Sequence, residues 1–261
     1  MRVHAFANFK GGVGKTSTVL QLAHTAARDG LSVLVVDTDG QRNASSALTG
    51  RDPDDWFELN LSHVLEKKSK TTLDDIVVPS KVDGITVAPA GDLGEMAAVL
   101  KSLSDRVRRE FVLDRALQSG PEFDLVLIDC PPAVNVLTLN AYVAARDGVV
   151  AVATPDENPY QAVRELITEI DATNEELGEG PPVAGLIINE VDARILDQRA
   201  YVRRLRNLAA AADIPVLGAP IPQLAVIAKV ARVGASVADS GHDRADELQH
   251  NFDRILADLT T

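Results

Sequence analysis

The sequence predicts an α/β fold built on a mostly parallel twisted sheet with helices on both faces. Short apolar runs alternate with helical patterns along the chain of 261 residues, the rhythm of strand–helix–strand units. Several runs are apolar throughout, as strands are when both faces of a sheet are covered. Apolar residues make up 46% of the chain and aromatics only 4%, so the core is mainly aliphatic. This length suits one α/β domain, and we expect residues 1–261 to form a single one.

The predicted strands are short apolar runs, most of them closed by a polar or turn-forming residue. They cover residues 3–7, 33–36, 85–88, 125–128, 149–153, 183–188 and 216–221. Four of them end in Asn8, Asp37, Asp129 and Asn189. Because the carboxyl ends of parallel strands meet at one edge of the sheet, where ligands bind, we expect these four side chains to gather there.

Helical patterns fill the intervals between the runs. Leu20, Ala23 and Ala27 recur at helical spacing and predict a helix over 17–28, which Gly30 ends. Further helices are expected over 95–117, 161–177 and 199–212, with two more near the C-terminus. The stretch from 50 to 84 is polar and weakly patterned, and we expect one short helix there, near 62–67.

Composition excludes several classes of protein. The chain has 38 acidic and 26 basic residues, a formal net charge of −12, which argues against a purely electrostatic DNA binder but not against a local basic patch. A single cysteine rules out an internal disulfide and any cysteine zinc site. No segment approaches the ~20 apolar residues of a membrane span, and none reads as a signal peptide. We therefore expect a cytoplasmic protein.

A glycine-rich stretch follows the first strand and opens the first helix, the context that a phosphate-binding loop requires. Its glycines let successive N–H groups point at phosphate oxygens, and the helix start adds the positive end of its dipole. Lys15 is expected to reach the β- and γ-phosphates, and the Thr16 hydroxyl to bind magnesium. The predicted ATP-binding residues here are Lys10, Gly11, Gly12, Val13, Gly14, Lys15, Thr16 and Ser17. This stretch indicates a P-loop NTPase architecture that binds a nucleotide together with Mg²⁺.

The loop departs from the usual GxxxxGK[ST] pattern. Phe9 stands where the first glycine is expected, and a second lysine, Lys10, precedes the glycine pair. A glycine-rich turn with surface lysines is the simpler alternative. The strand before the loop, the helix after it and the acidic residues further along the chain all favour the phosphate site.

Three aspartates at strand ends are the candidate acidic partners of the loop. Asp129 closes a four-residue apolar run, where a carboxylate is costly unless it is paired or lies near a cation, and it is the leading candidate for holding magnesium. Asp37 is expected to fix magnesium or the loop, and Asp39 to polarise the attacking water. The alternatives are a helix-capping role for Asp129 and a solvated turn for Asp39.

Taken together, the motifs KGGVGKT, DTDGQRNAS, DLVLIDCPP and TLNA resemble the ParA/MinD family of deviant Walker A ATPases, most closely its Soj-like partition proteins. The resemblance implies a weak, partner-stimulated ATPase and a homodimer that ATP brings together. Lys10 would reach the partner subunit's phosphates, and Asp39 would be needed for hydrolysis. Asn189 matches the family's adenine-contacting Asn, and Pro222 falls where the family lines the adenine pocket.

Two departures from the family pattern concern the switch loop and the DNA surface. The family usually has DxDPQGN, whereas Gly40 and Arg42 stand at two of these positions, and switch kinetics are expected to differ. Where the family often carries DNA-binding arginines after Pro222, this chain has Gln223 and Val226.

Basic residues on two predicted helices form a second candidate DNA surface. Arg199, Arg203 and Arg206 share one helical face, with Tyr201, Leu205 and Leu208 on the other. The predicted DNA-binding residues are Arg199, Arg203, Arg204, Arg206, Lys229 and Arg232. Such phosphate contacts are independent of sequence and weaken with salt. The alternative is an ordinary solvated basic face.

The predicted function is plasmid or chromosome partition. The ATP dimer would bind non-specific DNA on the nucleoid and be released when a centromere-binding ParB-type partner stimulates hydrolysis. We expect no N-terminal helix-turn-helix, and no basic amphipathic tail of the MinD type that would bind a membrane. A positioning ATPase that does not use DNA as its track is the main alternative, and an ATP-dependent amidase or ligase on the same fold is a third.

Overall fold

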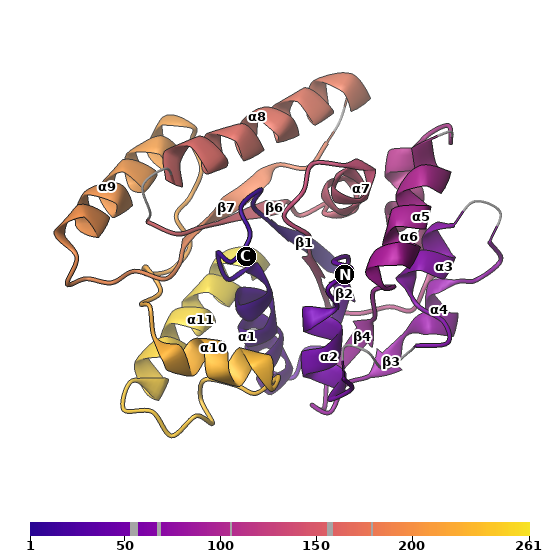
Figure 1. The fold of residues 1–261 in the computed structure, drawn as a ribbon. Helices are drawn as coiled ribbons and strands as arrows, with labels where there is room; N and C mark the ends of the chain where they lie inside the picture. Colours follow the sequence, from indigo (N-terminus) through magenta and orange to yellow (C-terminus); the bar gives the residue numbers. More distant parts are fainter. Residues whose placement is uncertain (53–56, 67–68, 105, 156–158, 179) are drawn as a thin grey trace.

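The computed structural model describes residues 1–52, 57–66, 69–104, 106–155, 159–178 and 180–261. A seven-stranded sheet with the order β3-β4-β2-β5-β1-β6-β7 lies at its centre (Figure 1). Its strands are β1 (Arg2–Ala7), β2 (Val33–Asp37), β3 (Val78–Pro79), β4 (Ile85–Ala88), β5 (Leu125–Asp129), β6 (Val149–Ala153) and β7 (Val183–Ile188). Neighbouring strands are parallel except for the two-residue β3, which pairs antiparallel with β4. The predicted α/β class is confirmed.

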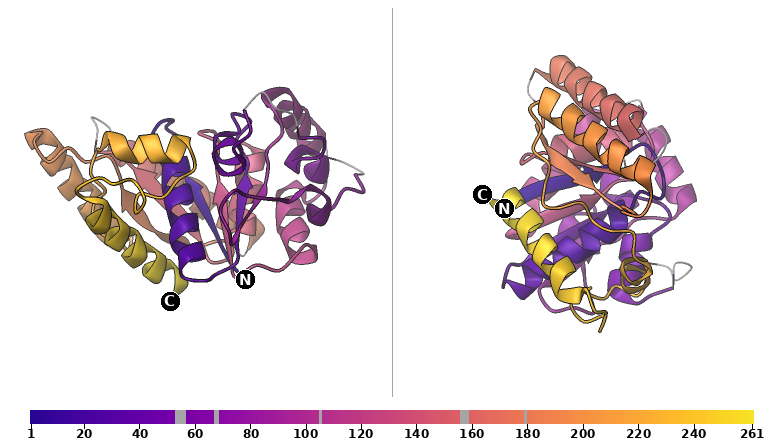
Figure 2. Two further views of the ribbon diagram at one scale, coloured as in Figure 1. Left: turned by 90° about the horizontal axis from the view of Figure 1, so that it is seen from below. Right: turned by 90° about the vertical axis from the view of Figure 1, so that its left-hand side faces the viewer.

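Helices cover both faces of the sheet. They are α1 (Lys15–Arg28), α2 (Asn43–Thr49), α3 (Leu61–Leu65), α4 (Leu73–Ile76), α5 (Leu93–Ser104), the 3₁₀ turn η1 (Arg109–Phe111), α6 (Val112–Ser119), α7 (Val136–Ala144), α8 (Pro159–Leu177), α9 (Leu196–Ala211), α10 (Ala225–Arg232) and α11 (Ala245–Thr260). Figure 2 shows α8 and α9 on one side of the strands and α11 on the other.

Two hydrophobic cores result from this arrangement. Along β1, Val3, Ala5 and Ala7 belong to the core beneath α3 to α9, whereas Phe6 belongs to the core beneath α1, α2, α10 and α11. Both sets are apolar because successive strand residues point to opposite faces and each face carries helices. The aliphatic composition of the predicted strands is the direct consequence.

The prediction of one continuous helix over 95–117 is wrong. The chain instead forms α5, the turn η1 and then α6, with Arg108 in the left-handed region at φ 54°. The Asn140 side chain of α7 accepts hydrogen bonds from the N–H groups of Val112 and Leu113 at 3.0 and 3.1 Å. A buried amide from a distant helix thus caps the start of α6, which a continuous helix would not permit.

The predicted strand 216–221 is also wrong. Only two isolated bridges form in this region, Leu186 with Val216 and Val191 with Pro222. Prolines at 215, 220 and 222 lack the N–H that a ladder needs, so the segment follows β7 without extending the sheet.

The short helices were predicted unevenly. The expected helix near 62–67 begins at Leu61 and ends at Leu65, and residue 67 lies outside the described part of the chain. The helices α2 and α7 follow strand-end motifs and were not predicted, since both are shorter than three turns. None of the described helices is long and apolar enough to cross a membrane.

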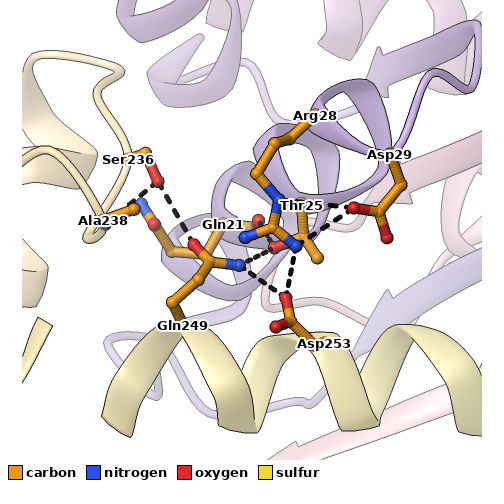
Figure 3. Close-up of polar contacts among 8 residues, drawn as sticks. All are labelled: Gln21, Thr25, Arg28, Asp29, Ser236, Ala238, Gln249 and Asp253. Carbon is orange, nitrogen blue, oxygen red and sulfur yellow. Dashed lines mark hydrogen bonds and ion pairs between the residues drawn. The ribbon is translucent and has the colours of Figure 1, made fainter. Parts of the chain in front are cut away.

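A buried polar network fastens α1 to the C-terminal segment (Figure 3). The Gln21 amide donates to the carbonyl of Ala235 at 2.9 Å and accepts from the N–H of Val237 at 2.7 Å. The Gln249 amide of α11 donates to the Thr25 hydroxyl at 3.0 Å. Directional bonds of this kind fix how α1 sits against α11, whereas apolar packing alone allows sliding.

Candidate nucleotide-binding site

The Asn8 side chain holds the loop between β1 and α1 in its conformation. The Asn8 amide donates to the Val152 carbonyl at 2.7 Å, and its oxygen accepts the N–H of Lys10 at 2.8 Å. Gly14 caps α1 in the left-handed conformation, with φ 83°. The loop therefore curls around the start of α1, where free N–H groups and the helix dipole favour an anion.

Lys15 lies inside this curl, and only 7% of its surface is exposed. Its ammonium donates to the carbonyls of Asn8 and Lys10, each at 3.3 Å. Burial lowers the pKa of Lys15, and the nearby Asp129 works in the opposite direction. These long bonds to carbonyls leave the ammonium suited to exchange them for phosphate oxygens, which bear full charge.

Asp129 faces the first turn of α1 from the end of β5. Its carboxylate accepts a 2.7 Å hydrogen bond from the Thr16 hydroxyl, while its second oxygen is buried and has no hydrogen-bond partner among the described residues. Burial raises the pKa of Asp129 to about 8, and the neighbouring Asp37 adds to this effect. An ionised carboxylate here requires a cation.

The residues present fit a magnesium ion. The unpaired Asp129 oxygen and the Thr16 hydroxyl are hard oxygen ligands, which Mg²⁺ prefers. The described residues contain no cluster of three or more histidine, cysteine or acidic side chains that would bind a metal unaided. A magnesium ion at this place would therefore share its coordination with nucleotide phosphates and water, as it usually does.

Asp37 and Asp39 have different surroundings. Asp37 pairs in register with Asp129 across β2 and β5, and it accepts hydrogen bonds from the N–H and hydroxyl of Ser45 at 2.8 and 2.7 Å. Burial raises the pKa of Asp37 to about 6. Asp39 is half-buried and lines the cleft in front of the loop. Asp37 is thus occupied with holding the start of α2, and Asp39 is open to the cleft.

That cleft has a volume of about 1080 Å³. Its walls include residues 11–17, Leu20, Asp39, Cys130 and Glu190, with Ala228, Ala231 and Arg232 from α10. The space runs from the phosphate loop past the first turn of α1 toward α10, and a nucleoside attached to bound phosphates would occupy it. Its size lies at the upper end of the range for small-molecule sites.

Asn189 contacts the loop, but neither Asn189 nor Pro222 is among the described residues that line the cleft. The Asn189 amide donates to the Val13 carbonyl at 2.9 Å, and a Cβ on Gly14 would approach its nitrogen to 2.1 Å. Pro222 is joined to this region through the bridge with Val191. Glycine is therefore required at position 14 for the end of β7 to touch the loop.

The basic residues fall into two separate groups. Arg199, Arg203, Arg204 and Arg206 are all exposed on α9. Arg204 stacks on Tyr201, with its guanidinium carbon 5.6 Å from the ring centre. Arg232 lines the nucleotide cleft, unlike the α9 arginines, and Lys229 is exposed on the same helix, α10. Arg232 thus lines the cleft, from a different helix than the α9 arginines.

The two departures in the switch loop have a structural explanation. A Cβ at Gly40 would lie 3.0 Å from the Cα and from Cδ2 of Leu93, so the first residue of α5 packs directly on this glycine. Arg42 adopts φ 57°, a left-handed conformation that suits the glycine usual at this position. Gly40 permits a close backbone approach, and Arg42 keeps a glycine-like backbone.

Sequence reasoning missed two residues at the site. Ser45 holds Asp37 but stands eight positions after it, and no spacing rule signals this contact. Glu190 lines the cleft directly after Asn189, so its position at a strand end was the available signal.

Comparisons with known proteins agree with this geometry. A family model described as an AAA domain matches residues 1–179. The chromosome-partitioning ATPase Soj of Thermus thermophilus is 32% identical over 260 residues, which cover 98% of this chain and 94% of that protein. The chromosome partitioning protein ParA of Caulobacter vibrioides is 34% identical over 199 residues, which cover 74% of this chain and 71% of that protein.

A solved structure shows the same fold with ligands bound. It is described as cobyrinic acid a,c-diamide synthase from Mycobacterium smegmatis with a bound ATP analogue and magnesium. The two chains are 31% identical, with a TM-score of 0.76, and the match covers 89% of this chain and 91% of that one.

Proposed function

The chain belongs to the ParA/Soj family of P-loop ATPases, and we propose that it is the ATP-dependent switch of a DNA partition system. It hydrolyses ATP and uses Mg²⁺. In the proposal, the ATP-bound homodimer holds non-specific DNA and a centromere-binding partner releases it by stimulating hydrolysis. One observation carries the proposal most directly: a second lysine, Lys10, precedes a phosphate loop that already contains a buried Lys15.

In this proposal the residues around the cleft have different roles in ATP hydrolysis. Lys15 and the loop N–H groups bind and orient the phosphates. Thr16 and Asp129 would hold magnesium, which when bound neutralises phosphate charge. Asp39, which lines the cleft, is placed to orient the attacking water. Asp37 would position the switch loop through Ser45.

The proposed dimer depends on the second lysine. The Lys10 backbone is fixed by Asn8, while Lys10 as a whole is exposed at the tip of the loop. Lys15 already supplies a cation within the same subunit, and the family resemblance implies that Lys10 reaches the phosphates of a second copy. ATP would then join two subunits face to face.

The proposed DNA surface is the exposed face of α9. Arg199, Arg203 and Arg206 point outward from a helix whose Leu205 is fully buried. Dimerisation doubles this face, so DNA affinity should depend on ATP even though the chain carries a net charge of −12. Association with the nucleoid would follow.

A binding assay tests the DNA role. Fluorescence anisotropy of a labelled duplex of arbitrary sequence, at low salt, should show binding with ATP but not with ADP. The double reversal Arg203→Glu with Arg204→Glu should weaken it by about tenfold or more, because phosphate contacts are lost and repulsion is added.

A matched control uses Lys101→Glu with Arg115→Glu, the same charge change on the exposed faces of α5 and α6. This variant should weaken binding far less. Absence of ATP-dependent binding by the wild-type protein would exclude DNA as the track and favour a positioning ATPase. Turnover of a small-molecule amide by the protein alone would instead favour a metabolic enzyme.

A further inference from the structure

Glu190 is an acidic residue in an unexpected place, directly on the phosphate loop. It lines the nucleotide cleft, and its Oε1 lies 3.8 Å from the position that a Cβ on Gly14 would occupy. Its backbone is left-handed, with φ 55°. The N–H groups on either side are fixed, Asn189 to Ala153 at 2.7 Å and Val191 to Ile221 at 2.9 Å. The side chain is therefore held over the loop by a strained but well-anchored backbone.

A carboxylate at this position would repel the phosphates of ATP unless the nucleotide offers it hydrogen-bond donors. Glu190 is only half-buried, and although burial raises its pKa, Lys10 opposes the change. An ionised carboxylate only accepts hydrogen bonds. The donors that ATP offers at neutral pH are its 6-amino group and its two ribose hydroxyls.

The place of Glu190 beside the phosphate loop decides between these donors. Gly14 caps α1 at the phosphate end. The Asn189 amide nitrogen is occupied by Val13, which leaves its oxygen to accept from the 6-amino group of the base. Glu190 adjoins Gly14 at the phosphate end, and the ribose of ATP is attached to its phosphates, whereas the 6-amino group lies on the far side of the base.

We infer that Glu190 binds the ribose hydroxyls of ATP and so selects ribonucleotides over deoxyribonucleotides. This rests on the proposed reading of the base by Asn189. Carboxylates recognise vicinal ribose hydroxyls in the same chemical way in other nucleotide sites. Two charge-assisted hydrogen bonds would offset the repulsion between the carboxylate and the phosphates.

Isothermal titration calorimetry of the full chain with Mg²⁺ and ATP, 2′-deoxy-ATP or 3′-deoxy-ATP tests the inference. The wild type should bind ATP about tenfold more tightly than either deoxy analogue, the effect of one charge-assisted hydrogen bond. Glu190→Ala should bind all three within about twofold of one another. Glu190→Gln, which keeps the length but not the charge, should show an intermediate preference.

The control is Asp52→Asn, which removes the same charge from the α2 end of the same cleft. It should change the affinity for ATP and both analogues by the same factor. If Glu190→Ala instead tightens binding of all three nucleotides equally, the carboxylate only repels phosphate and the inference is wrong. The inference is also wrong if the wild type binds ATP and the two deoxy analogues equally tightly. Failure of the wild type to bind ATP at all would count against the proposed function instead.

Discussion

Among single residues, Lys10 is the one on which the proposed ATP-dependent dimer depends. Its N–H is fixed by Asn8 at 2.8 Å, and Ala at this position would keep that bond. Lys10→Ala should therefore leave the affinity for ATP within about twofold but abolish the ATP-dependent dimer, since a cross-subunit phosphate contact is charge-assisted. Light scattering with and without ATP measures this. Lys15→Ala serves as the control and should lose ATP binding itself, whereas an intact ATP dimer of Lys10→Ala would refute the assignment.

Arg42 is a second residue whose replacement should change the stability of the protein. It holds φ 57° at the start of α2, and its Nε is buried without a hydrogen-bond partner among the described residues. Arg42→Gly should raise stability by about 0.5–1 kcal/mol, since relief of left-handed strain exceeds the entropic cost of glycine. Asn43→Gly, the next residue and the first of α2, has no positive φ to relieve and should lower stability. Urea unfolding measures both, and a loss of stability in Arg42→Gly would contradict the strain argument.

At the scale of elements, the polar network ties the helix that carries the phosphate loop to the C-terminal segment. Gln21→Leu would leave the Ala235 carbonyl and the Val237 N–H unpaired and buried, at a cost of about 2–4 kcal/mol in the free energy of unfolding. Gln118→Leu, the same change on the exposed side of α6, should cost less than about 0.5 kcal/mol. Equal losses in urea unfolding would show that the network contributes little.

This network also joins the nucleotide site to α10. Its partner segment, residues 235–238, directly follows α10, the helix that carries Arg232 into the cleft. Lys81 adds a hydrogen bond to the Val233 carbonyl at the end of that helix. The α10 wall of the cleft is thus positioned by the Gln21 contacts behind it and by the contact between Lys81 and Val233, which both line the cleft.

At the scale of the whole molecule, His4 links the first strand to the last helix and predicts acid sensitivity. It is 2% exposed, and its Nε2 bonds the Leu259 carbonyl at 3.1 Å. Burial lowers its pKa, against the opposing effects of the Leu259 carbonyl and Asp147, while Arg2 adds to the lowering.

The sign of the effect follows from proton binding. Below a pH of about 6.5 the unfolded chain takes up a proton at His4 that the folded chain does not, so stability falls as the pH drops. This contribution amounts to at most about 1.4 kcal/mol per pH unit. His4→Gln should lose less stability than the wild type between about pH 7.5 and 5.5 in thermal unfolding. His250→Gln, on the exposed side of α11, should behave as the wild type does, and an equally acid-sensitive His4→Gln would exclude this role.

Local sequence patterns were enough to predict the fold class, the phosphate loop and the acidic residues at the strand ends. Apolar runs at 33–36 and 125–128 became neighbouring strands, and Asp37 and Asp129 pair in register at their ends. These features were predictable because buried strands, glycine-rich turns and strand-end carboxylates are local patterns, each readable within about ten residues. The family motifs made the same assignment more specific.

Which distant residues come together at the site depends on the tertiary packing and could not be predicted from the sequence. The break in 95–117 depends on Asn140, and the place of Arg232 depends on how α10 packs against α1. Asn189 and the adjoining Glu190 reach the phosphate loop because Gly14 has no side chain where Asn189 approaches it. Contacts between segments this far apart in the chain are set by packing across the sheet, which local periodicity does not encode. The phosphate loop could therefore be predicted from the sequence, whereas the residues that form the other walls of the cleft could not.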